Sequence, residues 1–258
     1  NQLEANLLAE QITIFPLRNL LEVNTTIDPL APYQPTTLTS ANNNNFQDIV
    51  GNIQAKRALL ICAAGGHNIL LQGPPGTGKS LLAKAMAGIL PPLSFAELIT
   101  TTSIRSISGE SITQIDLQRP FRSPHHTSSA NAIIGGGAIP TPGEITLAHR
   151  GILFLDEFSE FRKDVLESMR EPLEEKMITI SRAQAKARFP ADFQLVAAMN
   201  PCPCGYSGDP EIHCRCSPLI KAKYLSKLSG PILDRIDLFS YVPRIPYQQL
   251  WQNNTAES

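Results

Sequence analysis

The chain carries few charged residues and almost no net charge. Charged residues make up 17% of its 258 residues, and 22 lysines and arginines are offset by 23 aspartates and glutamates, which leaves a formal net charge of -1. Soluble domains ordinarily contain about 25% charged residues. A uniformly basic coat for nucleic acid is therefore excluded, and any basic footprint must be local. The hydrophobic fraction of 42% is nevertheless sufficient for a sizeable core.

Long uninterrupted hydrophobic runs are also missing. The longest uncharged stretches, residues 58–78 and 123–143, are broken by Gly, Pro, Asn, Ser and His, so we expect neither to cross a membrane. The first residues, NQLEANLLAEQ, lack the basic start of a signal peptide. These absences predict a cytoplasmic protein with no membrane partner.

Three segments of different composition predict the domain organisation. Residues 1–27 hold one strand and one amphipathic helix pattern, too little for a core, and we interpret them as the end of a preceding domain. Residues 28–45, with three prolines and the run ANNNN, indicate a linker. Residues 46–258 are expected to hold the self-contained fold. The first residue is Asn rather than Met, which suggests a piece of a longer chain.

Short apolar strands alternate with helical patterns beyond residue 46. We expect strands at 68–72, 151–155, 193–199 and 238–242, and helices at 53–64, 79–90 and 163–175. This alternation predicts an α/β fold with a mainly parallel sheet that is covered on both faces. Residues 177–189 predict a two-stranded hairpin inserted between these elements.

A phosphate-binding loop follows the first predicted strand. The strand NILLQ leads into GPPGTGKS and then into a helix, which is the context that a P-loop requires. Its glycines let backbone N–H groups turn toward phosphates at the start of a helix. We expect Lys79 to reach the β- and γ-phosphates and Ser80 to bind Mg²⁺. The nucleotide-binding residues predicted from this motif are Gly73, Pro74, Pro75, Gly76, Thr77, Gly78, Lys79, Ser80 and Leu81.

Polar residues end two further predicted strands. In GILFLDEF, Asp156 is predicted to hold Mg²⁺ and Glu157 to polarise the attacking water, which favours an ATPase over a kinase that excludes water. Asn200 ends the strand FQLVAAMN, where its amide would bridge the γ-phosphate and the water; the alternative is a turn Asn before Pro201. Arg235, in GPILDRIDLF, is either a surface arginine paired with its acidic neighbours or an arginine finger directed at a neighbouring subunit's ATP.

Four of the five cysteines lie within fifteen residues. Cys202, Cys204, Cys214 and Cys216 form the pattern C-x-C-x9-C-x-C, and four thiolates brought together can satisfy a tetrahedral Zn²⁺. The spacing is tighter than in common zinc motifs, and His213 is an alternative ligand. The alternatives are that the four cysteines are free thiols or that they form disulfides.

A local basic footprint is present in the predicted hairpin. Arg182, Lys186 and Arg188 lie at even positions of ITISRAQAKARF with no acid among them, so they share one strand face and are candidates for DNA binding. A second acid-free stretch holds Arg215, Lys221, Lys223 and Lys227. Ordinary solvated faces are the alternative for both. For the adjacent His125 and His126, phosphate or structural hydrogen bonding is favoured over metal binding.

These motifs resemble those of known ATPases. FQDIVGNIQAKRAL, GPPGTGKS, GILFLDEF, Asn200 and GPILDRID resemble the AAA+ ATPases, with their αβα sandwich. The longer strings AAGGHNILLQGPPGTGKS, FRSPHHTSS, PGEITLAHRGILFLDEF, ISRAQAKARFPADFQLVAAMNPCPCG and GPILDRIDL resemble the magnesium-chelatase-like ComM/YifB family over residues 12–246. Members of that family carry a Lon-like domain before this module and a helical lid after it.

The resemblance implies a hexameric, ATP-driven motor that acts on single-stranded or branched DNA. It further implies branch migration during recombination in natural transformation, with Asp48, Ile49 and Val50 near the adenine. By motif match, Lys79, Glu157, Asn200 and Arg235 would be the catalytic residues. Two alternatives remain open: the ATPase subunit of a metal chelatase, and a module that remodels proteins.

Overall fold

The computed structural model describes residues 45–112, 117–137, 140–181 and 186–246. The end of a preceding domain predicted for residues 1–27, and the linker predicted for residues 28–45 except its last residue, lie outside them. The described residues fall into two compact units, one holding Pro92–Gln118 and the other holding the remainder. Among the described residues, no helix has both the length and the apolar character that a membrane span requires.

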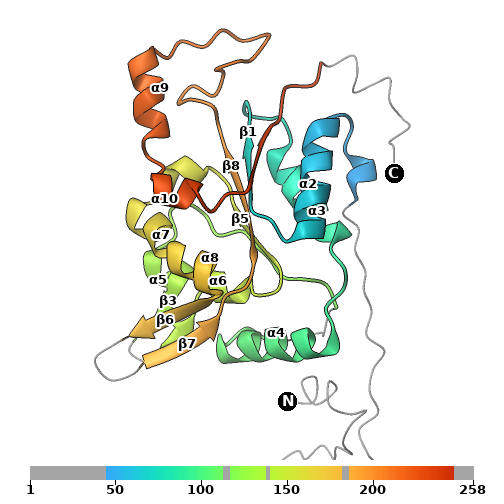
Figure 1. Cartoon of the computed structure of the whole chain (residues 1–258), viewed down its shortest axis with the longest axis vertical. Helices are drawn as coiled ribbons and strands as arrows, with labels where there is room; N and C mark the ends of the chain where they lie inside the picture. Colours follow the sequence, from blue (N-terminus) through green and yellow to red (C-terminus); the bar gives the residue numbers. More distant parts are fainter. Residues whose placement is uncertain (1–44, 113–116, 138–139, 182–185, 247–258) are drawn as a thin grey trace, which may run out of the picture. The chain divides into compact units, whose positions relative to one another are not determined.

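The larger unit is built on a five-stranded parallel sheet (Figure 1). From edge to edge its strands are β2 (Phe121–Arg122), β5 (Ile152–Leu155), β8 (Gln194–Met199), β1 (Ile69–Gln72) and β9 (Leu238–Tyr241). No two neighbouring strands of this sheet have consecutive numbers, so neighbouring strands are joined by crossover connections and not by hairpins. The predicted α/β class and parallel sheet are confirmed, while β2 was not predicted.

Alternate side chains of the central strands enter two separate cores. Leu70, Leu153 and Leu195 pack into one buried cluster, whereas Ile69, Ile152 and Val196 pack into the other. Successive side chains of a strand point to opposite faces, and near-continuous apolar strands are what a sheet covered on both sides needs. The sequence therefore specifies a three-layer αβα arrangement.

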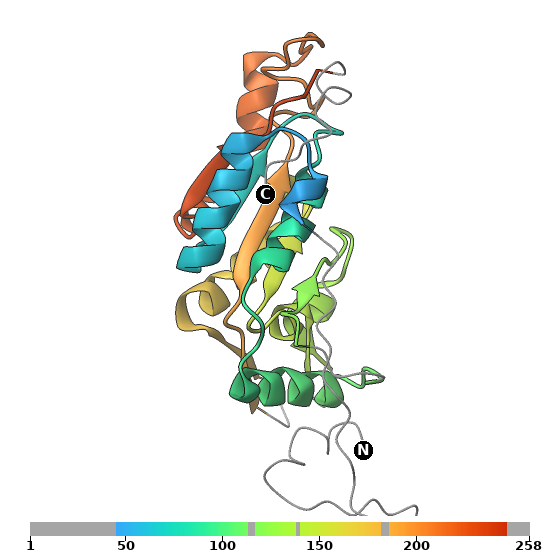
Figure 2. The same ribbon diagram turned by 90° about the vertical axis from the view of Figure 1, so that its right-hand side faces the viewer.

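The helices divide between the two faces of this sheet (Figures 1 and 2). One face is covered by α2 (Ile53–Gly65) and α3 (Lys79–Ile89), and the other by α5 (Ala130–Ile134), α6 (Glu144–Leu147), α7 (Lys163–Ser168), α8 (Arg170–Glu175) and α10 (Gly230–Leu233). Three shorter or peripheral elements are the 3-10 turns η3 (Phe46–Asp48) and η4 (Phe158–Glu160) and the helix α9 (Pro218–Leu225).

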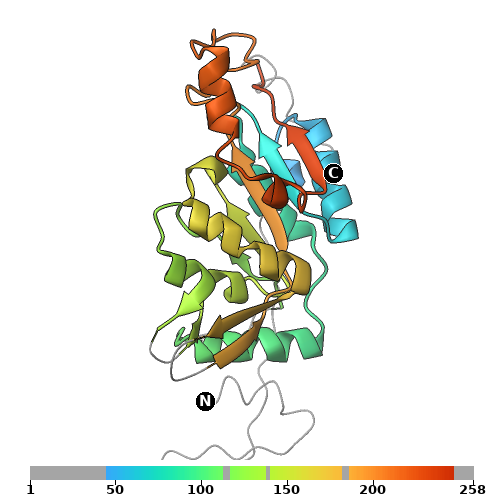
Figure 3. The same cartoon turned by 60° about the vertical axis from the view of Figure 1, so that its left-hand side comes forward.

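Two small antiparallel pairs are inserted into the larger unit. The predicted hairpin is present as β6 (Met177–Ser181) and β7 (Lys186–Pro190), visible in Figure 3. Ile178 and Ile180 on β6 are buried, and the opposite face is open to solvent. The second pair is β3 (Gly135–Gly136) with β4 (Thr141–Pro142).

The smaller unit is centred on α4 (Phe95–Ile107). Its first turn has a capping box, in which the Ser94 hydroxyl accepts from the Glu97 backbone N–H and the Glu97 carboxylate accepts from the Ser94 N–H. Reciprocal caps of this kind satisfy two helix-end donors. Leu93 and Leu98 form its small buried cluster.

Replacing a buried aromatic ring of the sheet should destabilise the larger unit strongly. Phe154 on β5 is 2% exposed and its ring stacks on Phe121 with centroids 5.9 Å apart. We expect Phe154→Ala to lower the free energy of unfolding by about 3–5 kcal/mol. Phe239 on the edge strand β9 is 62% exposed, so Phe239→Ala should change it by less than about 0.5 kcal/mol. Urea denaturation of both variants measures the difference, and equal losses would contradict the assigned burial.

Candidate functional site

The candidate site lies where three parallel strands end together. Gln72 at the end of β1 is paired with Met199 at the end of β8, and Leu155 at the end of β5 is paired with Ala197. The residues that follow these strands therefore leave the sheet at one edge. Ligands of open α/β sheets bind at this carboxyl edge.

The P-loop wraps around the ammonium group of Lys79. Lys79 Nζ donates to the carbonyl oxygens of Gly73 and Pro74, at 2.8 and 2.7 Å. Gly76 and Gly78 have φ of 75° and 85°, in the left-handed region that favours glycine. Burial lowers the pKa of the Lys79 ammonium from its ordinary value, and the negative charge of Asp156 acts in the opposite direction. Lys79 is the one basic residue of the loop GPPGTGKS.

Two oxygen ligands suited to Mg²⁺ lie in direct contact. The Ser80 hydroxyl donates to Asp156 Oδ2 at 2.7 Å, while Asp156 Oδ1 accepts from the Glu157 backbone N–H at 2.9 Å. Hydroxyl and carboxylate oxygens are the donors that this hard cation takes from proteins. The pair therefore fits the predicted magnesium site.

A cavity of about 500 Å³ opens on one side of the P-loop. Lys79, Asp156, Glu157 and Asn200 all line it, and Asn200 Oδ1 accepts from Lys79 Nζ at 3.4 Å. The structure thus brings four predicted residues from three strand ends to one cavity. A phosphate beside Lys79 would lie within reach of both a carboxylate and an amide.

A second cavity of about 460 Å³ lies on the other side of the P-loop. Its lining includes the three residues predicted near the base, Asp48, Ile49 and Val50, together with Gly76, Thr77, Gly78 and Leu81. Asn52 also lines it, and its side-chain Oδ1 is buried with no hydrogen-bond partner among the described residues. A base amino group is a donor that would satisfy this acceptor.

His126 contacts the predicted catalytic carboxylate. Its Nδ1 lies 2.8 Å from Glu157 Oε2. Phe121 of β2 is paired with Ile152 of β5, 31 residues later in the sequence. His126 and Glu157 are also 31 residues apart, so they lie beside each other in the segments that follow these two strands. The sequence favoured hydrogen bonding for this histidine, but its partner was missed because β2, with only two residues, gave no strand pattern.

Residues of the second basic stretch approach the first cavity. Lys223 and Lys227 line it, together with Tyr224. Lys227 Nζ pairs with the Glu160 carboxylate at 2.9 Å, and the Tyr224 hydroxyl accepts from Ser159 at 2.7 Å. Two of the four cations considered for DNA are therefore near the phosphate side of the nucleotide site.

Arg235 lies at the opposite end of β1 from the P-loop. Its backbone carbonyl accepts from the side-chain amide of Asn68, the residue before β1, at 2.8 Å. Asn68 also accepts from the Leu195 N–H at 2.8 Å, and its own N–H donates to Asp237 at 2.7 Å. The Arg235 guanidinium pairs with Glu174 of α8. The structure therefore does not bring Arg235 to the cavity that holds Lys79 in the same chain.

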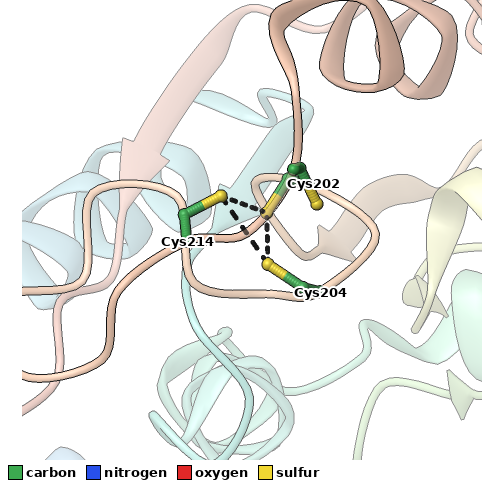
Figure 4. A group of neighbouring side chains, drawn as sticks. Cys202, Cys204 and Cys214 are labelled. Carbon is green, nitrogen blue, oxygen red and sulfur yellow. Dashed lines mark hydrogen bonds between the residues drawn. The ribbon is translucent and has the colours of Figure 1, made fainter.

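The four clustered cysteines converge after β8, and Figure 4 shows three of them, Cys202, Cys204 and Cys214. The Cys202 sulfur lies 3.4 Å from that of Cys204 and 3.7 Å from that of Cys214, and the last two are 3.7 Å apart. All four ligand sulfurs lie within 4.8 Å of one another, and none is in a disulfide. Zinc–sulfur bonds of about 2.3 Å imply sulfur separations of about 3.8 Å in a tetrahedron. The cluster therefore fits a zinc ion without His213.

The local environment favours thiolate at one of these cysteines. A hydrogen bond from the Tyr206 backbone N–H lowers the pKa of Cys204 to about 6. Burial, by contrast, raises the pKa of the Cys202 thiol. The fifth cysteine, Cys62 on α2, is fully buried, and burial raises its pKa to about 12, which makes it an inert core thiol.

Two of the three predicted DNA-binding cations share one exposed face of the hairpin. Lys186 and Arg188 are exposed on β7, opposite Ser181 and Thr179 of β6. Arg182 lies outside the described residues. The hairpin precedes β8 and lies at the end of the larger unit away from α9 (Figures 1 and 3).

The parallel sheet and its polar edge define the class, which is an α/β protein with a P-loop at the carboxyl edge of its sheet. The chain belongs to the family described as magnesium chelatase, subunit ChlI, whose profile matches residues 45–250. This confirms the resemblance drawn from the sequence motifs.

Curated relatives place the chain within this family. The competence protein ComM of Haemophilus influenzae is 47% identical over 268 residues, covering 100% of this chain and 52% of its own length. Protein YifB of Escherichia coli is 52% identical over 216 residues, with 83% and 42% covered. The magnesium-chelatase 67 kDa subunit of Chlorobaculum parvum is 30% identical over 162 residues, with 60% and 23% covered. The chain spans about half the length of the first two.

Removing the Asn52 amide should weaken the binding of ATP but not of its phosphates alone. Asn52 has φ of 53°, so Asn52→Gly removes the amide without backbone strain. We expect the Kd for ATP to rise about three- to tenfold, the value of one hydrogen bond, in a titration with a fluorescent ATP analogue. Competition by inorganic triphosphate should be unaffected, and an equal loss for both ligands would contradict a contact to the base.

Proposed function

We propose that the chain is the ATP-hydrolysing part of a hexameric motor that acts on DNA. Within that activity, we propose branch migration during recombination of DNA taken up by natural transformation. The observation that carries ATP hydrolysis is the contact between Ser80 and Asp156 beside Glu157 and Lys79. Similarity to a relative named as a competence protein supports the biological setting.

Each residue of the phosphate cavity has a role in this proposal. Lys79 binds the β- and γ-phosphates, and Ser80 with Asp156 holds Mg²⁺, which when bound offsets the phosphate charge. Glu157 accepts the proton of a water molecule whose oxygen attacks the γ-phosphorus, and the bond to the β–γ bridging oxygen breaks to give ADP and phosphate. Asn200 orients that water and the γ-phosphate.

His126 acts as a positioning residue for Glu157. A flexible carboxylate loses rotamer freedom when it is held in one place, and the 2.8 Å contact with His126 supplies that restraint. His126 belongs to the loop after β2, so a shift of this loop would change the orientation of Glu157, the proposed general base.

Arg235 completes a neighbouring subunit's site in the hexamer. Its location at the amino end of β1, away from its own P-loop, supports action in trans, for which its guanidinium would exchange Glu174 for a phosphate of the neighbouring subunit. A guanidinium supplied in this way stabilises negative charge in the transition state of phosphoryl transfer.

The hairpin β6–β7 contacts the DNA backbone, and the cysteine cluster holds a structural zinc ion. Exposed Lys186 and Arg188 on one strand face support the first statement, because lysine and arginine that neutralise phosphates supply much of the affinity for nucleic acid. Sulfur separations of 3.4–3.7 Å support the second.

The ATPase subunit of a metal chelatase is the second candidate. Membership of a family described as magnesium chelatase, subunit ChlI, and the 30% identity to a chelatase subunit favour it. The two functions differ in partner, because a DNA motor is stimulated by DNA and a chelatase is not. ATPase rates with and without single-stranded, duplex and branched DNA decide between them.

Neutralising Glu157 should separate nucleotide binding from hydrolysis. We expect Glu157→Gln to reduce kcat at least about 100-fold, because a general base is lost, while ATP still binds. Phosphate release and a fluorescent-nucleotide titration measure the two effects. Glu171→Gln, at an exposed position of α8, is the matched control and should retain hydrolysis. Undiminished turnover in Glu157→Gln would remove this residue from the mechanism.

Removing the two hairpin cations should weaken DNA binding and its salt dependence. We expect Lys186→Ala with Arg188→Ala to make the slope of log K against log salt less negative by about 1.4 for single strands, at about 0.7 per phosphate contact. The affinity for ATP should not change. The control is Arg57→Ala with Lys84→Ala, which removes two exposed cations from α2 and α3. Equal slopes for both double variants would contradict a hairpin contact.

A further inference from the structure

The loop of residues 201–217, termed the cysteine loop, joins β8 to α9. It has no regular helix or strand, and within this fully described stretch Cys202 is the one buried hydrophobic side chain. Loops of this length without secondary structure are uncommon in compact domains. With so little apolar packing, the loop depends on its thiol cluster for a fixed shape.

The first turn of the cysteine loop packs directly on the P-loop. Gly205 has φ of 87°, and a Cβ at this position would lie 2.7 Å from Pro75 Cδ and 3.9 Å from Asn200 Cγ. Its backbone N–H donates to the Cys202 carbonyl at 2.9 Å. The same turn that carries two of the cluster's cysteines thus rests against the phosphate-binding backbone.

The cysteine loop also borders both cavities of the nucleotide site. Pro203, between two cysteines, lines the cavity that contains Lys79 and Glu157. Glu211, shortly before the other two cysteines, lines the cavity that contains Asp48 and Gly78. Between these points, Asp209 accepts from Arg244 at 3.1 Å, and Arg244 lines the second cavity as well. The loop therefore spans the P-loop from the phosphate side to the base side.

We propose that zinc bound by the cysteine cluster sets the affinity of the chain for ATP, by holding the cysteine loop against Pro75 of the P-loop. This inference rests on the proposed ATP site and zinc site and adds a thermodynamic link between them. With the metal bound, Gly205, Pro203 and Glu211 are fixed at the borders of both cavities. Without it, ATP binding must also order the loop, and that entropy cost weakens binding.

The link acts in both directions. If zinc raises the affinity for ATP by a given factor, ATP raises the affinity for zinc by the same factor. Typical coupling between two sites is about 5- to 150-fold, and we expect about tenfold, because the loop borders the nucleotide site rather than forming it. ATP should accordingly shift the equilibrium between the protein and a competing chelator toward zinc-bound protein by the same factor.

A matched pair of glycine variants isolates the contact from the metal. Gly205 and Gly208 both have left-handed φ, 87° and 84°, but a Cβ at Gly208 would meet only Tyr241 Oη, at 3.5 Å. We expect Gly205→Ala to retain zinc and raise the Kd for ATP about tenfold, a coupling of the usual size. Gly208→Ala, which carries the same backbone strain, should retain both zinc and affinity.

Zinc removal by chelation tests the proposal, and Cys204→Ser is a second route to the zinc-free protein. The full chain is purified with zinc, its metal content is measured by mass spectrometry, and ATP affinity is titrated before and after chelation and after zinc is restored. A reversible loss of affinity near tenfold, a typical coupling, with Cys204→Ser behaving like the chelated protein, is the expected result. Unchanged affinity after zinc removal, or equal effects of the two glycine variants, would overturn the link. A chain that binds ATP but no zinc refutes the metal site, whereas a zinc-loaded chain that binds no ATP refutes the proposed function itself.

Discussion

Parallel pairing of β1 with β8 is the constraint on which the site depends. It brings the end of β1, which continues into the P-loop, beside the end of β8, which continues into Asn200. Pairing of β8 with β5 adds Asp156 and Glu157 at the same edge. A slip of one residue between these strands would turn every buried side chain to the opposite face. The two hydrophobic cores therefore hold the catalytic geometry in register.

The near-zero net charge is compatible with a local basic face on the hairpin of the larger unit. Acidic Asp156 and Glu157 lie at the carboxyl edge of the sheet with Lys79, whereas the exposed cations of β7 lie on a hairpin that enters β8 from its other end. In the proposed function, work done by ATP at one end would have to pass through the sheet to reach DNA at the hairpin. A packed parallel sheet suits this role because tightly packed interiors have low compressibility and transmit strain.

Long strands and strong motifs could be predicted from the sequence, whereas short elements could not. The strands β1, β5, β8 and β9 are apolar runs bounded by turn residues, and their predicted limits agree with the structure to within a residue or two. Strand β2 has two residues and no periodicity, and α4 lies in a segment where no helix was predicted. The contact of His126 with Glu157 depends on the register of β2, which a single sequence does not display. Likewise, cysteine spacing predicts a cluster but not its contact with Pro75.

Asn68 has a consequence that extends beyond its own hydrogen bonds. Asn68 is the residue before β1, and its side-chain amide and backbone N–H form hydrogen bonds with Leu195, the Arg235 carbonyl and Asp237. The four residues of β1, on the order of 13 Å in length, separate these hydrogen bonds from the start of the P-loop. β1 therefore fixes the distance between the segment that carries Arg235 and the P-loop. In the proposed ring, every copy would therefore hold its Arg235 segment and its P-loop at this same separation.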